Sequence, residues 1–170
     1  GSLGAASDQN ANKMLAGKKV NAQAIINGLT QGVNGSCSPK DFETLLQLVY
    51  LGFTAPRKDA EAFESWKSRT KAQLESAEAD PLYSLNDTIG KMMYGNHPRF
   101  IRLKASDIDQ INLDRVYEMY QQCYANAGDF TFFFVGNIDL ETAKPLIASY
   151  LGSLPATGKK GQWIDRKTDV

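Results

Sequence analysis

Few side chains in this sequence could do chemistry. His97 is the only histidine in 170 residues, so no site that needs two histidines can form, and a Ser-His-Asp triad would have to use this one ring. Its place beside Pro98 is more typical of a loop histidine than of a catalytic base. Cys37 and Cys123 are too few for a disulfide framework and too far apart for a C-x-x-C motif, so we expect reduced thiols.

Carboxylates and aromatic rings offer two further possibilities. Glu75, Glu78 and Asp80 resemble the paired carboxylates of a glycosidase, but at a polar helix end such groups are far more often solvated. The aromatic run at residues 130–134 could imitate a base-stacking platform, yet no basic residue interrupts it. A buried strand is the better interpretation. No phosphate-binding glycine loop occurs.

The composition excludes several classes of partner. Nineteen basic residues balance nineteen acidic ones, which argues against a nucleic-acid groove or an anionic membrane surface. No apolar run approaches the roughly 18–20 residues that span a bilayer. A hydrophobic share of 42% is ample for a core, and the length fits one domain.

The hydrophobic periodicity predicts an α+β domain in which helices cover one face of an antiparallel or mixed sheet. Two strands at residues 19–27 and 29–36 should form a hairpin, and Ser38 should cap the following helix. The apolar run at residues 129–135 should be a central strand covered on both faces. Further helices are expected at residues 58–77, 84–93, 112–127 and 139–151. Three strands make a thin sheet, so we expect the domain to be N-terminally truncated, with a missing part that completes the sheet.

Three motifs then resemble the pitrilysin/insulysin (inverzincin) family of zinc metallopeptidases: the helix LDRVYEMY at residues 113–120, the segment DFTFFFVGNID at 129–139, and IASYLGSLP at 147–155. The sequence YGNHP at 94–98 is similar to the loop that precedes this helix in the family. Each motif is weak alone, but their order and spacing are specific. The resemblance covers roughly residues 15–157.

The resemblance implies tandem α/β repeats whose two halves close around a peptide. One half binds zinc through His-x-x-Glu-His and a distal glutamate, and the other lacks the metal. This sequence contains no His-x-x-Glu-His, and the distal position falls on Gln73, a poor zinc ligand, or on Glu75 if the register shifts by two. The resemblance therefore implies a repeat from the zinc-free half, with no catalytic residue and no metal of its own, and zinc in the other half of the parent.

We expect one repeat domain at residues 1–157, a fragment of a larger multi-repeat protein, and an exit linker at 158–170. Its expected function is to enclose peptide substrate and to pack against sister domains. A non-enzymatic assembly subunit, like the core proteins of respiratory complexes, is the alternative, and an RNA-binding module of ferredoxin-like fold is a distant third. The compartment stays open, with a periplasmic or cell-envelope parent as one option.

A candidate peptide-binding strand follows from the same resemblance. In the catalytic half of the family, substrate adds a strand to the sheet edge along a segment whose Asn-Ala stretch resembles Val20-Asn21-Ala22. The segment lacks the lysine and proline that usually protect exposed edges. We expect it to lie at an edge that pairs with a peptide, a sister domain or, in a homodimer, a second copy; an inner strand is the alternative. The whole segment comprises Val20, Asn21, Ala22, Gln23, Ala24, Ile25 and Ile26.

Overall fold

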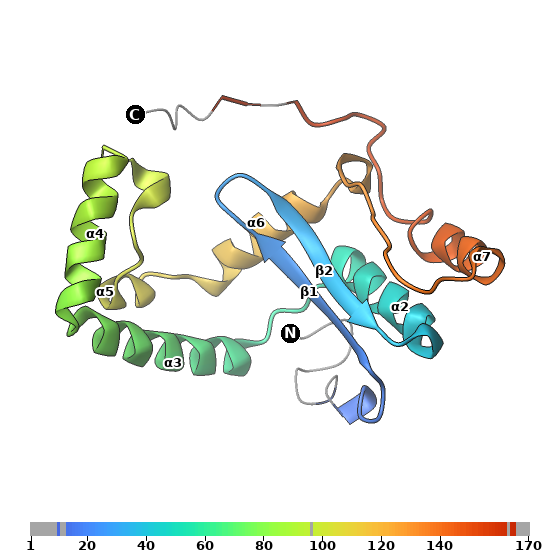
Figure 1. The fold of residues 1–170 in the computed structure, drawn as a ribbon, viewed down its shortest axis with the longest axis horizontal. Helices are drawn as coiled ribbons and strands as arrows, with labels where there is room; N and C mark the ends of the chain where they lie inside the picture. The colour runs from blue at the N-terminus through green and yellow to red at the C-terminus, as the bar shows by residue number, and fades with distance from the viewer. Residues whose placement is uncertain (1–9, 11–12, 96, 163, 166–170) are drawn as a thin grey trace. The chain divides into compact units, whose positions relative to one another are not determined.

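A computed structural model describes residues 10, 13–95, 97–162 and 164–165. The chain divides into two compact units, which we call unit 1 (residues 1–59 and 117–161) and unit 2 (residues 60–116 and 162–170). The chain passes between the units three times, and one of these passages, between residues 116 and 117, falls within a helix. The described elements are labelled in Figure 1 and are β1 (Val20–Ile26), β2 (Gln31–Cys37), η1 (Pro39–Asp41), α2 (Phe42–Thr54), α3 (Ala60–Glu78), α4 (Pro81–Met93), η2 (Pro98–Phe100), α5 (Ala105–Ile108), α6 (Leu113–Tyr124), η3 (Ala127–Asp129) and α7 (Leu140–Tyr150).

The sheet of unit 1 is an antiparallel hairpin of β1 and β2, in a register that pairs Val20 with Cys37 and Ile26 with Gln31. Residues 27–30 make the turn, where the Asn27 amide donates to the Thr30 carbonyl at 2.7 Å. Helix α2 packs against both strands and also against α7. The predicted fold class, helices against one face of an antiparallel sheet, is thereby confirmed.

The core of unit 1 grows from one face of α2. Leu45, Leu46, Val49 and Phe53 recur at helical spacing and are buried, as their periodicity predicts. The ring of Phe53 packs edge-to-face against Tyr124 of α6, with centroids 5.2 Å apart. The hairpin and the two helices therefore share a single aromatic and aliphatic core.

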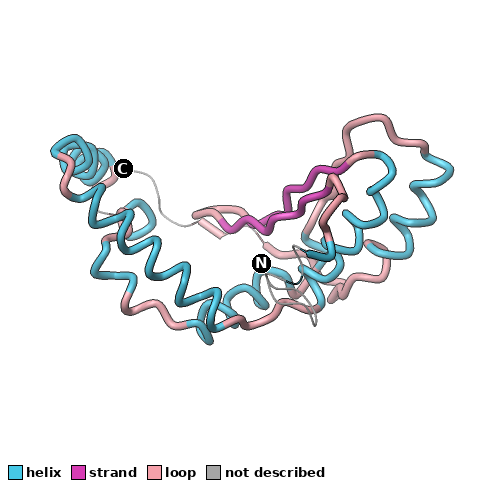
Figure 2. The backbone as a smooth tube through the Cα atoms, turned by 90° about the horizontal axis from the view of Figure 1, so that it is seen from below, coloured by secondary structure: helices cyan, strands magenta, loops and turns pink. Residues whose placement is uncertain are grey.

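The strand predicted at residues 129–135 is wrong for the described structure. After the short helix η3 the segment runs without strand pairing, and Figure 2 draws it as loop while the hairpin alone is strand. Phe130 and Phe132 pack on the core, whereas Phe133 is 85% exposed and Val135 is 98% exposed. The apolar pattern indicates a segment whose two faces are both buried. A strand also requires hydrogen bonds to a neighbouring backbone, and no described part of the chain pairs with this segment.

Unit 2 is helical. Helix α5 packs against α3 and buries Ala105 and Ile108. The Ala105 amide donates to Glu78 at 2.8 Å, so a carboxylate from the end of α3 caps the start of α5. Lys71 of α3 and Asp109 form an ion pair at 2.6 Å. In the described part of the chain, no helix has both the length and the apolar character needed to cross a membrane.

The division into one domain at residues 1–157 and a linker at 158–170 stays a prediction. The two compact units describe how the chain packs, and they do not test where the domain ends. Ser38 occupies the N-cap position of η1, the short helix that follows β2, as expected, but its side chain makes no capping hydrogen bond there. Asp41 takes the N-cap position of α2, and the Ser38 hydroxyl donates to its carboxylate instead.

Candidate functional site

The outer edge of β1 is the candidate site. The Ser38 amide donates to Lys19 and the Asn27 amide donates to Thr30, so with the observed register the backbone groups of Asn21, Gln23 and Ile25 point toward β2. Those of Val20, Ala22, Ala24 and Ile26 must then point to the opposite edge. Within the described residues the sheet has two strands, so no strand pairs with this edge.

The turn end of the hairpin is fixed by one tyrosine. The Tyr124 hydroxyl, on α6, lies 3.1 Å from the Ile25 carbonyl oxygen and 2.6 Å from that of Gly32, and its single O–H donor is shared between them. Burial raises the pKa of this phenol, so it stays a proton donor at all physiological pH values. The sequence did not predict this role of the Tyr124 hydroxyl, because periodicity shows which face of a helix is buried and not which carbonyl groups lie beside it.

The opposite end of the hairpin is tied to α2 by Asp41. Its carboxylate accepts hydrogen bonds from the Lys19 amide at 3.0 Å and from the Ser38 hydroxyl at 2.5 Å. The bond from Ser38 is the largest influence and lowers the pKa of Asp41; burial opposes it, and the Lys19 amide and the charges of Lys40 and Lys18 support it. Both ends of β1 are thus held by side chains from helical elements. These contacts hold β1 in place on the helices of unit 1.

The two faces of the hairpin differ in chemistry. Val20 and Ala22 pack on the core, with Val33 and Cys37 of β2 beside them. Polar side chains occupy the other face; Asn21 accepts hydrogen bonds there from the Ser36 amide at 3.0 Å and the Ser36 hydroxyl at 3.2 Å. Gln23 and Asn34 continue this polar row. A ligand at the edge would therefore meet backbone groups first and amide side chains second.

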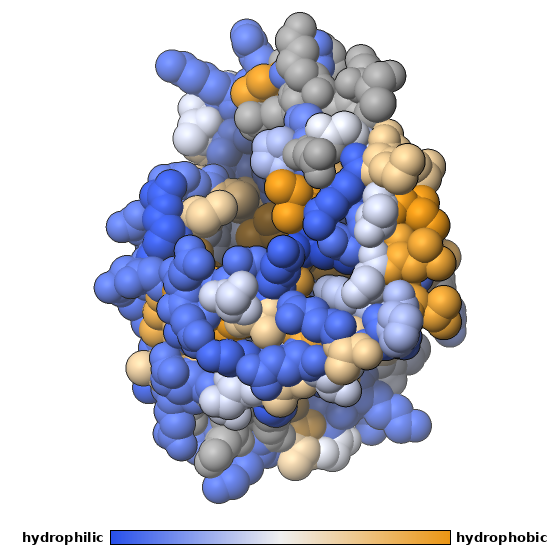
Figure 3. Space-filling model, turned by 90° about the vertical axis from the view of Figure 1, so that its left-hand side faces the viewer, coloured by the Kyte–Doolittle hydropathy of each residue, from blue (hydrophilic) through white to orange (hydrophobic). Residues whose placement is uncertain are grey.

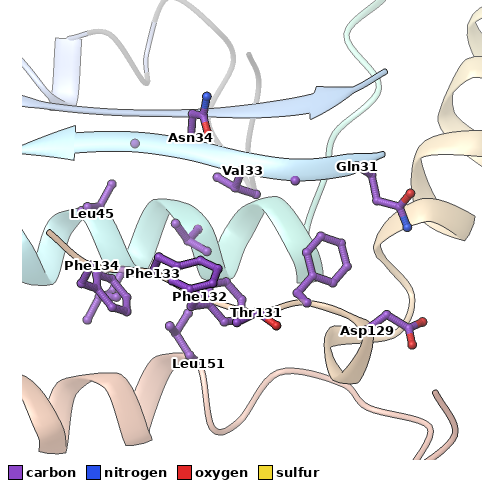
Figure 4. A pocket seen from close by; sticks show the side chains of 15 residues that line it. Gln31, Val33, Asn34, Leu45, Asp129, Thr131, Phe132, Phe133, Phe134 and Leu151 are labelled. Atoms are coloured by element: carbon purple, nitrogen blue, oxygen red, sulfur yellow. The ribbon is translucent and has the colours of Figure 1, made fainter. Parts of the chain in front are cut away.

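The free edge of β2 has a different character. It faces the extended segment at residues 129–134 across a cavity of about 380 Å³, which Leu45, Leu46 and Val49 of α2 and Leu151 also line. Figure 4 shows Phe132, Phe133 and Phe134 on one side of this cavity and β2 on the other. The backbone groups of Ala22 and Ala24 point away from β2 at the outer edge of β1. By the same alternation, the backbone groups of Val33 and Gly35 point away from β1 and toward this cavity.

The carboxylates and the histidine considered as candidate catalytic or metal-binding residues lie in unit 2, and they do not form a common site. Gln73 and Glu75, the two candidates for the distal ligand position, are both exposed on α3. His97 accepts a hydrogen bond from the Arg99 amide at 3.2 Å and begins the short helix η2. Asp80 caps α4 through the Leu82 amide. Among the described residues, no three His, Cys, Asp or Glu side chains gather where they could hold a metal.

Comparison with known proteins gives concordant results. A family profile described as "Peptidase M16 inactive domain" matches residues 110–170. A zinc protease PQQL-like protein of Arabidopsis thaliana is 30% identical over 118 residues, which cover 68% of this chain and 12% of that protein. The probable zinc protease PqqL of Haemophilus influenzae is 25% identical over 130 residues, covering 76% of this chain and 14% of that protein. The chain therefore spans about an eighth of these curated relatives.

Two solved structures share the fold. The periplasmic protease PqqL from Escherichia coli superposes with a TM-score of 0.75 at 20% identity, covering 93% of this chain and 17% of that one. The ferredoxin protease FusC, solved with Arabidopsis ferredoxin, gives 0.75 at 10% identity, covering 98% and 18%.

The fold is thus an α+β domain shared with these two protease chains. The chain belongs to the M16, or pitrilysin, family and is an inactive-type domain of a zinc-protease-like protein. The resemblance carried by the motifs at residues 113–120, 129–139 and 147–155 is confirmed, including its assignment to the zinc-free half.

Proposed function

We propose that this domain forms part of the wall of a peptide chamber in an M16 protein, and that it pairs an extended peptide along the outer edge of β1. The observation that carries the proposal is the row of backbone groups at Val20, Ala22, Ala24 and Ile26, which no strand of the described chain pairs with. Backbone pairing is indifferent to side chains, so it suits a protein that handles many peptides. Hydrolysis itself belongs to zinc-activated water in the other half of the parent.

The edge of β2 has another role in this proposal. Its cavity is lined by apolar side chains and by the extended segment at residues 129–134, so an added strand would cover both Phe133 and the β2 backbone. We assign this place to a strand from elsewhere in the parent protein, which completes the sheet. That leaves β1 as the edge for substrate.

The test removes one backbone donor from the edge and leaves the hairpin ladder intact. In Ala24→Pro the lost N–H faces outward, and proline is tolerated on edge strands. Ala24→Val is the matched control, because it adds bulk on the strand and retains the N–H. Loss of this one edge hydrogen bond, about 0.5–1.5 kcal/mol, should lower kcat/KM of the parent protein for a fluorogenic unstructured peptide about 2–13-fold. The control should stay within about twofold.

Hydrogen exchange provides the structural readout. Without peptide, the amides of Ala22, Ala24 and Ile26 should exchange quickly, while those of Gln23 and Ile25 are protected by β2. Added peptide should slow the first group. Equal kcat/KM for both Ala24 variants, or uniform protection along Val20–Ile26 without peptide, would remove the edge from the binding surface. If the parent neither binds nor cleaves peptide, the alternative of a non-enzymatic assembly subunit is favoured.

A further inference from the structure

Helix α4 turns its polar face toward its own unit. Tyr83, Ser84, Asp87 and Thr88 line a cavity of about 290 Å³ together with groups from outside the helix. Those groups are Glu78 of α3 and two basic residues, Arg102 and Lys104. The guanidinium of Arg102 lies 5.1 Å from the centre of the Tyr83 ring, so this contact belongs to the packing of unit 2.

The opposite face of α4 is apolar and uncovered. At about 100° per residue, five side chains fall within an arc of about 100°, on the far side of the helix from Asp87. All five are between 44% and 78% exposed: Leu82, Leu85, Ile89, Met92 and Met93. We call these five residues the α4 stripe. Figure 3, which looks onto the side of the molecule where α4 lies, shows hydrophobic side chains gathered in a band beside a mostly hydrophilic surface.

This orientation is the reverse of what burial favours. An amphipathic helix of a water-soluble unit normally packs its apolar side inward, and contiguous exposed apolar patches mark interaction surfaces. Each exposed leucine, isoleucine or methionine forgoes the burial that stabilises cores. The stripe therefore needs cover from outside unit 2.

A membrane surface fits the α4 stripe poorly. Interfacial helices carry rows of lysine and arginine on the polar face, but α4 has only Lys91, which pairs with Asp87 four residues earlier. The relatives are far longer than this chain, which covers 12% and 14% of the two curated ones. A protein of that kind carries most of its surface in other domains. Interfaces between domains of one chain cover this sort of patch.

We propose that the α4 stripe is a docking surface for a sister domain of the same parent chain. The proposal rests on the proposed function, in which this chain is one domain of a longer M16 protein. Because the stripe contains no charged residue, the partner surface must be apolar and uncharged at its centre. The contact should therefore be nearly insensitive to salt.

Thiol labelling tests the proposal. Met92→Cys places a reporter in the stripe, and Ser76→Cys places one on the exposed face of α3 as the matched control. Both variants are made in the parent protein and in the 170-residue chain, and labelling is corrected for Cys37 and Cys123. In the short chain the two reporters should react at similar rates. In the parent, Met92→Cys should react at least ~10-fold more slowly than Ser76→Cys, because a buried thiol waits for local opening.

Each other outcome overturns the proposal. Equal rates in the parent would show a free stripe. Slow labelling of Met92→Cys in the short chain at every concentration would show that the chain covers its own stripe. Slowing that depends on concentration would identify a second copy, and slowing by anionic vesicles would identify a membrane. The result is independent of peptide binding, since a parent in which Ala24→Pro has no effect can still protect position 92.

Discussion

The strongest test of the fold compares neighbouring phenylalanines in the segment at residues 129–135. Phe132 is half-buried. The centroid of its ring lies 6.2 Å from that of Phe53 and 6.5 Å from that of Phe130. Phe133 is 85% exposed. A central strand would bury both side chains on opposite faces, whereas the observed structure buries only one. Replacing each by alanine therefore separates the two arrangements.

The magnitudes follow from burial. A fully buried phenylalanine costs about 3–5 kcal/mol when cut to alanine. Phe132 keeps only part of that burial and gains from two ring contacts, so Phe132→Ala should destabilise the chain by about 2 kcal/mol. Phe133→Ala should change stability by under about 0.5 kcal/mol, as surface substitutions do.

Urea unfolding of the 170-residue chain measures both values, and the m-values show whether the unfolded states are comparable. Equal costs for the two variants would refute the reasoning, since Phe133 would then be covered in solution and the segment would be a strand after all. In the parent protein we expect the difference to shrink, because the proposed added strand covers Phe133.

Two further predictions concern the ends and the packing of the hairpin. Gly35→Ala should cost about 1–3 kcal/mol by urea unfolding, because a Cβ there would lie 2.6 Å from Leu45 Cδ1; Gly32→Ala, where nothing lies within 4 Å, is the control, and equal costs would contradict the close packing. The pKa of Asp41 is lowered in the folded chain, chiefly by Ser38, so its contribution to stability is present above the unfolded pKa and is lost as pH falls through the folded pKa. Melts from pH 7 down to pH 2 should therefore fall more steeply for the natural chain than for Asp41→Asn; parallel curves would contradict the role of this carboxylate.

Much of the fold could be predicted from local pattern. The helical spacing of Leu45, Leu46, Val49 and Phe53 identifies the buried face of α2, because a 3.6-residue period leaves few other arrangements. Asp139 caps α7 by accepting from the Glu141 amide, as its position predicts. Such features depend on neighbours in sequence.

Features that depend on neighbours in space were missed. Apolar residues at 130–135 predict burial, but whether a strand forms depends on a second backbone that the sequence pattern cannot locate. For the candidate site, the alternation of apolar and polar residues predicted the strand Val20–Ile26. It did not predict the hydrogen bonds by which Tyr124 and Asp41 hold the two ends of this strand.

The two anchors bear on the proposal that the outer edge of β1 pairs with a peptide. A hairpin alone is marginally stable in water, so an unpaired edge would fray and lose its alignment. Here Tyr124 holds the carbonyls beside the turn, and Asp41 holds the opposite end through the Lys19 amide. Neither contact uses the outward groups of Ala22 or Ala24. Helical side chains therefore hold both ends of the hairpin and leave the outward backbone groups of β1 available, as the proposed peptide pairing requires.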